Sequence, residues 1–322
     1  MKKILLSIIA LLATGLLWPS ITLAQGSGIR ANFQQLVSHW SKPDDKYYLV
    51  IHSLSGYLDI TDQNLRILIK TKSGSQKEVG YDNFILNNLG QLMNKRYKNT
   101  RLFRFNLVID NSGSIDNQNL RFVENALTKF INNLPVVFEG QIIKFSDTVK
   151  KSPFTNDKSE LIRFIKEPFN RGNTALFDGI ANAVEALKNA SGSVPLSFSV
   201  IMTDGYDNAS HKTQKYQDKN SFKRYILAET TQAKIPLFIV GVTDDVDTPL
   251  LREISKFGVY EAAQNFPDLD RAFEVINAVI KDTYIITIPK ASSYLGNADR
   301  LFLAEKSPAT GNFTTIQEFS IK

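Results

Sequence analysis

The chain shows two patterns of apolar and polar positions, and each predicts a different kind of structure. From about residue 102 to residue 283, short continuous apolar runs alternate with segments whose apolar residues recur as on one face of a helix. The runs predict strands at 102–110, 139–147, 196–205, 235–242 and 259–262. The periodic segments predict helices at 117–134, 174–190, 221–234, 248–258 and 268–283. Because strands that alternate with helices form βαβ units, we expect an α/β domain with a doubly wound, mainly parallel sheet.

Strand patterns without helices dominate on both sides of this segment. "YYLVIHSL" and "NLRILIKT" precede it, and "YIITIP", "RLFLAEK" and "NFTTIQEFSIK" follow it. We expect them to pack as one small β-sandwich-like unit that carries the α/β domain as an insertion. Within the stretch before them, Phe33, Leu36 and Trp40 suggest a short helix. The predicted division is a signal peptide at 1–24, a linker at 25–44, an N-terminal β segment at 45–102, the α/β domain at 103–283 and a C-terminal β segment at 284–322.

The first residues have the layout of a secretory signal peptide. A charged start, "MKK", precedes the apolar run "ILLSIIALLATGLLW", and small residues offer a cleavage position after Ala24. The run is short for a membrane span, although an uncleaved N-terminal anchor is the alternative. No later stretch of the sequence is long and apolar enough to cross a bilayer. We therefore expect an exported protein, periplasmic or secreted, of bacterial type, without a transmembrane segment after cleavage.

Composition argues against several classes of site. The 322-residue chain has no cysteine, so it has no disulfide, no thiolate metal site and no cysteine nucleophile. Its three histidines form no HExxH pair, which argues against a histidine zinc site or a histidine-based triad. The formal net charge of +6 is mild, and we expect no nucleic-acid partner. A solvated linker explains the one basic cluster better than phosphate binding does; it consists of Lys95, Arg96, Lys98, Arg101 and Arg104.

Oxygen-bearing side chains gather where the expected strands end. "FNLVID" ends at Asp110 and "FSVIMTD" at Asp204, and ligands of doubly wound sheets bind beyond the carboxyl ends of the strands. Ser112, Ser114 and Thr174 lie in the neighbouring loops. Oxygen donors without nitrogen or sulfur suit a hard cation such as Mg²⁺, which keeps water in part of its shell. Alternatively, the two serines cap the helix that follows them.

These motifs resemble those of the von Willebrand factor A domain family, the ligand-binding module also found in integrins. "DNSGS" is similar to the family's DxSxS element, "GNTALFDGI" to its threonine loop and "MTDGYDN" to its second aspartate loop, in the family's order. The resemblance implies a Rossmann-like fold and a metal-ion-dependent adhesion site for Mg²⁺ or Mn²⁺. Ser112 and Ser114 would bind the ion through their hydroxyls. Thr174 and Asp204 would bind directly or through water, and Asp110 would act through water and hydrogen bonds.

Three further residues of these motifs have less defined roles. Asn173 stands where the family often has glycine. Asp178 either hydrogen-bonds the metal site from its helix or is an ordinary acid of a first helical turn. Asp207 either supports the site or, as we expect, shapes the turn together with Asn208.

The resemblance implies a metal-dependent binding module of the adhesion type and not an enzyme. Its partner would be a protein that presents an Asp or Glu side chain to the open coordination position of the cation. A structural subunit of a bacterial envelope assembly is an alternative. A metal-assisted hydrolase is a further alternative, but it needs a base beside an activated water, and every motif carboxylate is assigned to the cation. No GxSxG elbow or P-loop occurs in the sequence.

Overall fold

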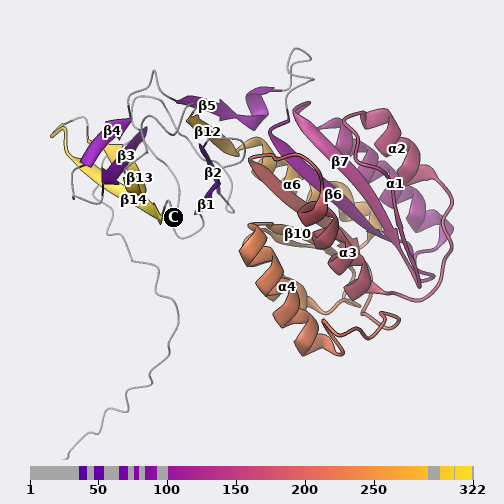
Figure 1. Ribbon diagram of the computed structural model, residues 1–322. Coiled ribbons are helices and arrows are strands. Elements are labelled where there is room, and N and C mark those ends of the chain that lie inside the picture. Colours follow the sequence, from indigo (N-terminus) through magenta and orange to yellow (C-terminus); the bar gives the residue numbers. More distant parts are fainter. Residues whose placement is uncertain are drawn as a thin grey trace, which may run out of the picture.

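Two lobes lie side by side in the computed structural model of the chain (Figure 1). The structure describes residues 36–41, 47–53, 65–71, 76–79, 84–92, 101–288, 298–307 and 309–320. Within these ranges, no helix has the length and apolar character that a membrane crossing requires. The expected signal peptide, residues 1–24, lies outside the described residues.

The larger lobe is built on a six-stranded sheet with the order β11-β10-β9-β6-β7-β8. Neighbouring strands are parallel except for β8, which runs antiparallel to β7 at one edge. The strands are β6 (Phe103–Asp110), β7 (Phe138–Phe145), β8 (Val149–Lys151), β9 (Leu196–Thr203), β10 (Leu237–Val242) and β11 (Tyr260–Ala263). This arrangement confirms the expected doubly wound, mainly parallel sheet.

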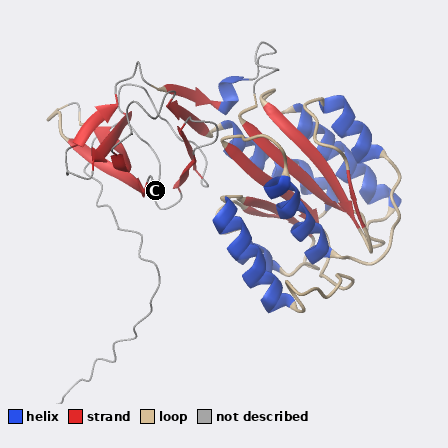
Figure 2. Ribbon diagram, in the orientation of Figure 1, coloured by secondary structure: helices blue, strands red, loops and turns tan. Residues whose placement is uncertain are grey.

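Helices cover both faces of this sheet (Figure 2). One face packs on α1 (Asn117–Asn132), α2 (Lys158–Lys166) and α6 (Leu269–Lys281). The other packs on α3 (Leu176–Asn189), α4 (Lys219–Ala233) and α5 (Thr248–Ile254). The central strand β6 serves both layers, since Phe105 and Leu107 face the first set of helices and Val108 faces the second. All eight residues of β6 are buried, including the polar Arg104 and Asn106, whose side chains have hydrogen-bond partners.

Close packing sets the position of α3, the helix that follows the threonine loop. A side chain at Gly179 would lie 2.8 Å from the ring of Phe145, the last residue of β7. Glycine therefore lets the first turns of α3 lie directly against the end of the sheet. This contact fixes the start of α3 near the carboxyl ends of the strands.

The smaller lobe is a sandwich of two antiparallel four-stranded sheets that combine both ends of the chain. One sheet has the order β1-β2-β12-β5, with strands Leu36–Ser41, Tyr47–Ser53, Tyr284–Ile288 and Ile85–Asn88. The other has the order β14-β13-β3-β4, with strands Phe313–Ser320, Ala298–Lys306, Leu65–Thr71 and Gln76–Val79. Buried residues of both sheets, among them Ile51, Ile67, Ile286 and Leu301, form its core. The expected β unit of the flanking segments is thus present, while the exact domain boundaries stay a prediction.

The structure corrects the expectation for the stretch before residue 45. Leu36–Ser41, which lies in the expected linker and in its suggested short helix, is strand β1 and pairs with β2 along its length. The spacing of Leu36 and Trp40 fits one helical face, but pairing with β2 decides the conformation. Phe33 lies outside the described residues. The sequence interpretation also omitted α2 and β8.

One buried apolar cluster extends from the larger lobe into the smaller one. Val50 of β2 and Ile285 of β12 belong to the same buried cluster as the α1 and α6 side of the larger lobe. A 3-10 turn, η3 (Leu89–Leu92), packs on α6 as well, and the Leu89 amide donates to the Thr283 carbonyl at 2.9 Å. The helix α6 therefore ends inside an interface and continues directly into β12.

Candidate metal centre

The centre lies where the neighbouring strands β6 and β9 end. Asp110 is the last residue of β6, and Asp204 directly follows β9, which pairs with β6 in parallel. The expectation that both aspartates lie at one edge of the sheet is confirmed by this pairing. The loop after β6 carries the two serines. Helix α1 is capped by Asp116, whose carboxylate accepts from the Asn119 amide at 2.7 Å, so the cap does not require a serine hydroxyl.

Short hydrogen bonds connect the strand ends and the serines. The Ser112 and Ser114 hydroxyls lie 2.8 Å apart, and the Ser114 hydroxyl donates to Asp204 Oδ1 at 3.1 Å. Asp110 accepts from the Ser112 amide at 3.0 Å and from the Thr203 hydroxyl at 2.7 Å. Asp110, Ser112 and Asp204 are buried, whereas Ser114 is exposed. Hydrogen bonds among buried atoms therefore hold this group in place, and Ser114 is its solvent-exposed member.

Thr174 joins this group from the loop between α2 and α3. Its amide donates to Asn208 Oδ1 at 2.8 Å, and its carbonyl accepts from the Asn208 amide at 3.0 Å. A side chain at Gly205, the residue after Asp204, would lie 3.5 Å from the Thr174 hydroxyl. The Thr174 hydroxyl thus faces the same edge of the sheet as the carboxylates.

Two acidic groups share this small, desolvated space. Burial raises the pKa of Asp110 to about 6, and the nearby charge of Asp204 adds to the rise. Burial also raises the pKa of Asp204, although hydrogen bonds from Ser114 and Ser112 lower it in part. Among the described residues, no lysine, arginine or histidine forms an ion pair with either carboxylate. A cation placed between these groups would remove the repulsion and offset the desolvation.

The donor set fits a hard divalent cation. Two carboxylates and three hydroxyls offer oxygen alone, which suits Mg²⁺ or Mn²⁺. In the described part of the chain, no group of three or more His, Cys, Asp or Glu side chains is arranged to hold a metal. Metal binding at this edge would therefore depend on the hydroxyls of Ser112, Ser114 and Thr174 as much as on the carboxylates.

Asp178 and Asp207 have hydrogen-bond partners away from the five oxygen donors. Asp178 accepts from the His211 amide at 3.0 Å and the Tyr216 hydroxyl at 2.7 Å, and it is hydrogen-bonded to His211 Nδ1 at 2.8 Å. Asp207 accepts from the Phe177 amide at 3.1 Å and from the Ser210 hydroxyl. Both aspartates hold the segment after Asp204 against the start of α3, and Asp207 also accepts from a residue three positions further along its own segment, Ser210.

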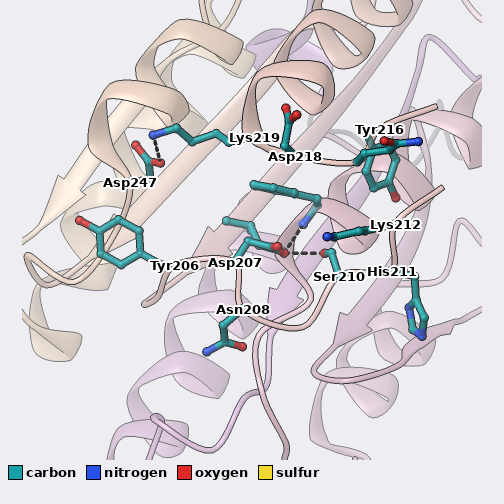
Figure 3. A pocket seen from close by; sticks show the side chains of 13 residues that line it. Tyr206, Asp207, Asn208, Ser210, His211, Lys212, Tyr216, Asp218, Lys219 and Asp247 are labelled. Carbon is teal, nitrogen blue, oxygen red and sulfur yellow. Dashed lines mark hydrogen bonds and ion pairs between the residues drawn. The ribbon is translucent and has the colours of Figure 1, made fainter. Parts of the chain in front are cut away.

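A cavity of about 430 Å³ lies beside this segment, and none of the five oxygen donors is among the residues that line it (Figure 3). Its walls include Phe177, Tyr206 and Tyr216, and Lys219 pairs with Asp247 at 2.9 Å on one side. Tyr206 is 55% exposed and lies two residues after Asp204.

Three residues that support the centre escaped the sequence interpretation. Thr203 orients Asp110, Asn208 holds the Thr174 backbone, and Asp147 accepts from the Asn173 amide at 2.7 Å. Thr203 and Asp147 had a signal, since each is a polar residue at the carboxyl end of an expected strand. Asn208 was singled out only as a turn residue.

Comparison with known proteins places this fold. The family model described as von Willebrand factor type A domain matches residues 106–277. No curated protein matches the chain. Among solved structures, von Willebrand factor type A from Catenulispora acidiphila is 11% identical with a TM-score of 0.50, over 93% of this chain and 74% of that one. At this identity the likeness shows the fold alone.

Two further solved structures are similar over a shorter part of the chain. The proximal thread matrix protein 1 from the mussel byssus, with a zinc-occupied MIDAS motif, is 16% identical with a TM-score of 0.47, over 64% of this chain and 50% of that one. The chain thus spans about half the length of the mussel protein. The vWF domain of the type V pili tip protein Mfa5 from Porphyromonas gingivalis is 13% identical with a TM-score of 0.45, over 56% of this chain and 95% of that one.

Proposed function

Because the chain belongs to the von Willebrand factor type A domain family, we propose that its larger lobe binds one divalent cation, Mg²⁺ or Mn²⁺, and through it a protein partner. Domains of this family are adhesion or protein-interaction modules. The observation that carries the proposal is the convergence of five oxygen-bearing side chains at one edge of the sheet, where no basic side chain of the described residues forms an ion pair with the two carboxylates. These side chains are Asp110, Ser112, Ser114, Thr174 and Asp204.

Each side chain has a distinct part in the proposed centre. Ser112 and Ser114 hold the cation through their hydroxyls, and Thr174 and Asp204 hold it directly or through water. Asp110 stays behind them, because the Ser112 amide and the Thr203 hydroxyl already occupy its two oxygens. The bound cation supplies a positive centre for a carboxylate, and the exposed side of Ser114 gives a partner's Asp or Glu access to it.

We propose binding rather than catalysis at this centre. Asp110 and Asp204 are both engaged by hydroxyls or amides of the centre, so neither is a free base for an activated water. The nearby His211 is directed to Asp178 on the other side of the segment after Asp204. A docking function inside an envelope assembly would use the same cation and differ only in where the partner originates.

Export is a further part of the proposal. Residues 1–24 carry the pattern of a cleaved signal peptide, and a periplasmic or secreted location would expose the centre to envelope or external proteins. N-terminal sequencing of the protein recovered from its native compartment should begin at Gln25. A chain that still begins at Met1 in a membrane fraction would support the anchor instead.

Calorimetric titration of the metal-stripped chain with MgCl₂ and MnCl₂ tests the metal centre. We expect a single site in the wild type and no measurable binding in Ser112→Ala or Asp204→Ala. Asp270→Ala, which removes an exposed carboxylate of α6, is the matched control and should bind as the wild type does. Wild-type affinity in both centre variants would refute the assignment.

A pull-down from envelope or external proteins tests the mode of partner binding. The immobilised chain is used with Mg²⁺, with chelator, and as Ser114→Ala with Mg²⁺. We expect partners only in the first condition, and their capture should be lost when one acidic residue of the partner is changed to its amide. Equal recovery in all three conditions would mean that the partner surface lies away from the cation.

A further inference from the structure

The loop that carries Thr174 is held by the strand next to the metal centre. This loop, residues 167–175, connects α2 to α3 and has no regular secondary structure. At the end of β7, the Lys144 ammonium donates to the Glu167 carbonyl at 2.5 Å, and the Ser146 hydroxyl donates to the Asn170 carbonyl at 2.9 Å. The Ala175 amide donates to the Ser146 carbonyl at 2.9 Å. The loop is therefore anchored to β7 at its start, middle and end.

Asp147 contacts the two residues directly before Thr174. Asp147 Oδ1 accepts from the Asn173 amide at 2.7 Å. The same carboxylate lies so close to Gly172 that a Cβ at position 172 would overlap it. In addition, the Gly113 amide of the serine loop donates to the Gly172 carbonyl at 2.8 Å. Gly172 and Asn173 are thus clamped between Asp147 and the loop of Ser112 and Ser114.

This clamp uses the backbone of Asn173 and the absence of a side chain at Gly172. The position where the family often has glycine is occupied by Asn173, yet the close approach is made at Gly172. Asp147 is not hydrogen-bonded to any of the five oxygen donors, and no ion pair involves it in the described ranges. Its contacts therefore fix the backbone position of residues 172 and 173 and do not hold a cation.

We infer that Asp147 is a positioning residue of the metal centre, which acts by fixing the backbone of residues 172–174 so that the Thr174 hydroxyl faces the cation. The inference rests on the proposed metal binding. Carboxylates that orient metal ligands have large effects on affinity even without touching the metal. Asp147 acts here on the backbone before the ligand, together with Gly172 as its steric counterpart.

Titration of the full chain with MnCl₂ by calorimetry tests this role. Asp147→Ala should bind Mn²⁺ about 10-fold more weakly than the wild type, since the Asn173 amide loses its acceptor. Asp147→Asn should stay within about 3-fold of the wild type, because the amide oxygen still accepts that bond. Gly172→Ala should weaken binding by a similar factor, because its methyl group displaces the exposed Asp147 carboxylate from the Asn173 amide. Adding Asp147→Ala to Gly172→Ala should weaken binding no further, because both changes remove the same hydrogen bond.

Asp157→Ala is the matched control, since Asp157 also accepts one backbone amide bond, from Ser159, at the start of α2. Its Mn²⁺ affinity should equal that of the wild type. A second readout is amide hydrogen exchange of Asn173 and Thr174 in the metal-free chain, which should accelerate in Asp147→Ala and not in Asp157→Ala. A structural role without positioning would lower the melting temperature and leave Mn²⁺ affinity unchanged.

The outcomes separate the two levels of the proposal. If the wild type binds Mn²⁺ and Asp147→Ala binds equally well, or if Asp147→Asn is as weak as Asp147→Ala, the positioning role is refuted and the metal centre stands. Unchanged exchange of the Asn173 amide in Asp147→Ala also refutes it. If the wild type binds no Mn²⁺, the proposed function fails, and the positioning role fails with it.

Discussion

Two clusters of buried carboxylates lie within the same loops, and they differ in what neutralises them. Asp178 is surrounded by donors of the protein itself: the His211 amide, the His211 ring and the Tyr216 hydroxyl. Asp110 and Asp204 accept hydrogen bonds from the Ser112 amide and from serine and threonine hydroxyls, without an ion pair among the described residues, and burial raises the pKa of each. The Asp178 carboxylate has its hydrogen-bond donors within the protein. The charges of Asp110 and Asp204 are compensated only when a cation binds. Position along the sequence does not distinguish the two groups of carboxylates, because Asp178 lies only four residues after Thr174, a donor of the proposed metal centre.

The largest expected effect is a gain of stability from metal in the second cluster alone. At a free Mg²⁺ concentration of 1,000 times its Kd, the wild type should gain about 4.1 kcal/mol of unfolding free energy. Ser112→Ala should gain none, whereas Asp178→Asn should keep the gain. Chemical denaturation with Mg²⁺ and with chelator measures the difference. If Asp178→Asn also lost the Mg²⁺-dependent increase in unfolding free energy, Asp178 would belong to the metal centre, and the distinction between the two clusters would be wrong.

A smaller effect is expected when the first cluster loses its carboxylate. Asp178→Ala leaves the buried Tyr216 hydroxyl and the His211 amide without their acceptor, which should cost about 3 kcal/mol in the metal-free chain. Its Kd for Mg²⁺ should stay near that of the wild type, because Asp178 does not contact the five donors. Denaturation with chelator, paired with calorimetric titration, measures both quantities. A loss of metal affinity larger than 10-fold at full folding would contradict this division.

The smallest effect concerns Tyr216 and depends on pH. Burial and the hydrogen bond to Asp178, with further repulsion from Glu185, raise the pKa of Tyr216 above its ordinary value of 10.0. The folded state therefore holds this proton more tightly than the unfolded state, so the resulting stability is present below pH 10 and is lost as the pH rises further. Tyr216→Phe should cost about 1 kcal/mol at neutral pH and should lose less stability between pH 10 and 11.

Tyr206→Phe is the control for that measurement, since Tyr206 is an exposed tyrosine of the same segment. Burial also raises the pKa of Tyr225 to about 12, but this residue is unchanged in both variants and contributes equally to their pH profiles. Parallel profiles for the wild type and Tyr216→Phe would show that Asp178 does not hold the Tyr216 proton.

The sequence was sufficient for the parts of the structure that depend on local patterns. Segments rich in apolar residues predicted β6 and β9, and their ends predicted Asp110 and Asp204 at one edge of the sheet, because neighbouring parallel strands end on the same side. The resemblance of three motifs to the von Willebrand factor A domain family implied the five oxygen donors. That these donors bind a metal stays a prediction, since the structure shows their convergence and not a bound ion.

The parts that escaped the sequence depend on partners that are distant along the chain. Leu36–Ser41 has an apolar spacing that fits a helix, and only its pairing with β2 makes it a strand. Helix α2 begins at a capping residue, Asp157, and has apolar positions at Leu161 and Phe164, so its signal was present and was not used. The contact of Asp147 with Gly172 could not be predicted, because nothing in the sequence fixes the distance between two loops.

The interleaving of the smaller lobe has a consequence for the order of events during folding. Ile51 of β2 pairs with Tyr284 of β12, and Ile67 of β3 pairs with Leu303 of β13, across the whole length of the larger lobe. Strand pairs of such separation form late, because closing long loops is slow compared with local helix and strand formation. During synthesis, β2 and β3 would emerge before the larger lobe, and their apolar residues would stay exposed while the larger lobe folds from segments that are close in sequence. Once the larger lobe has folded, it brings β12 and β13 close to β2 and β3. The remaining loop closure is then shorter, which favours completion of the sandwich.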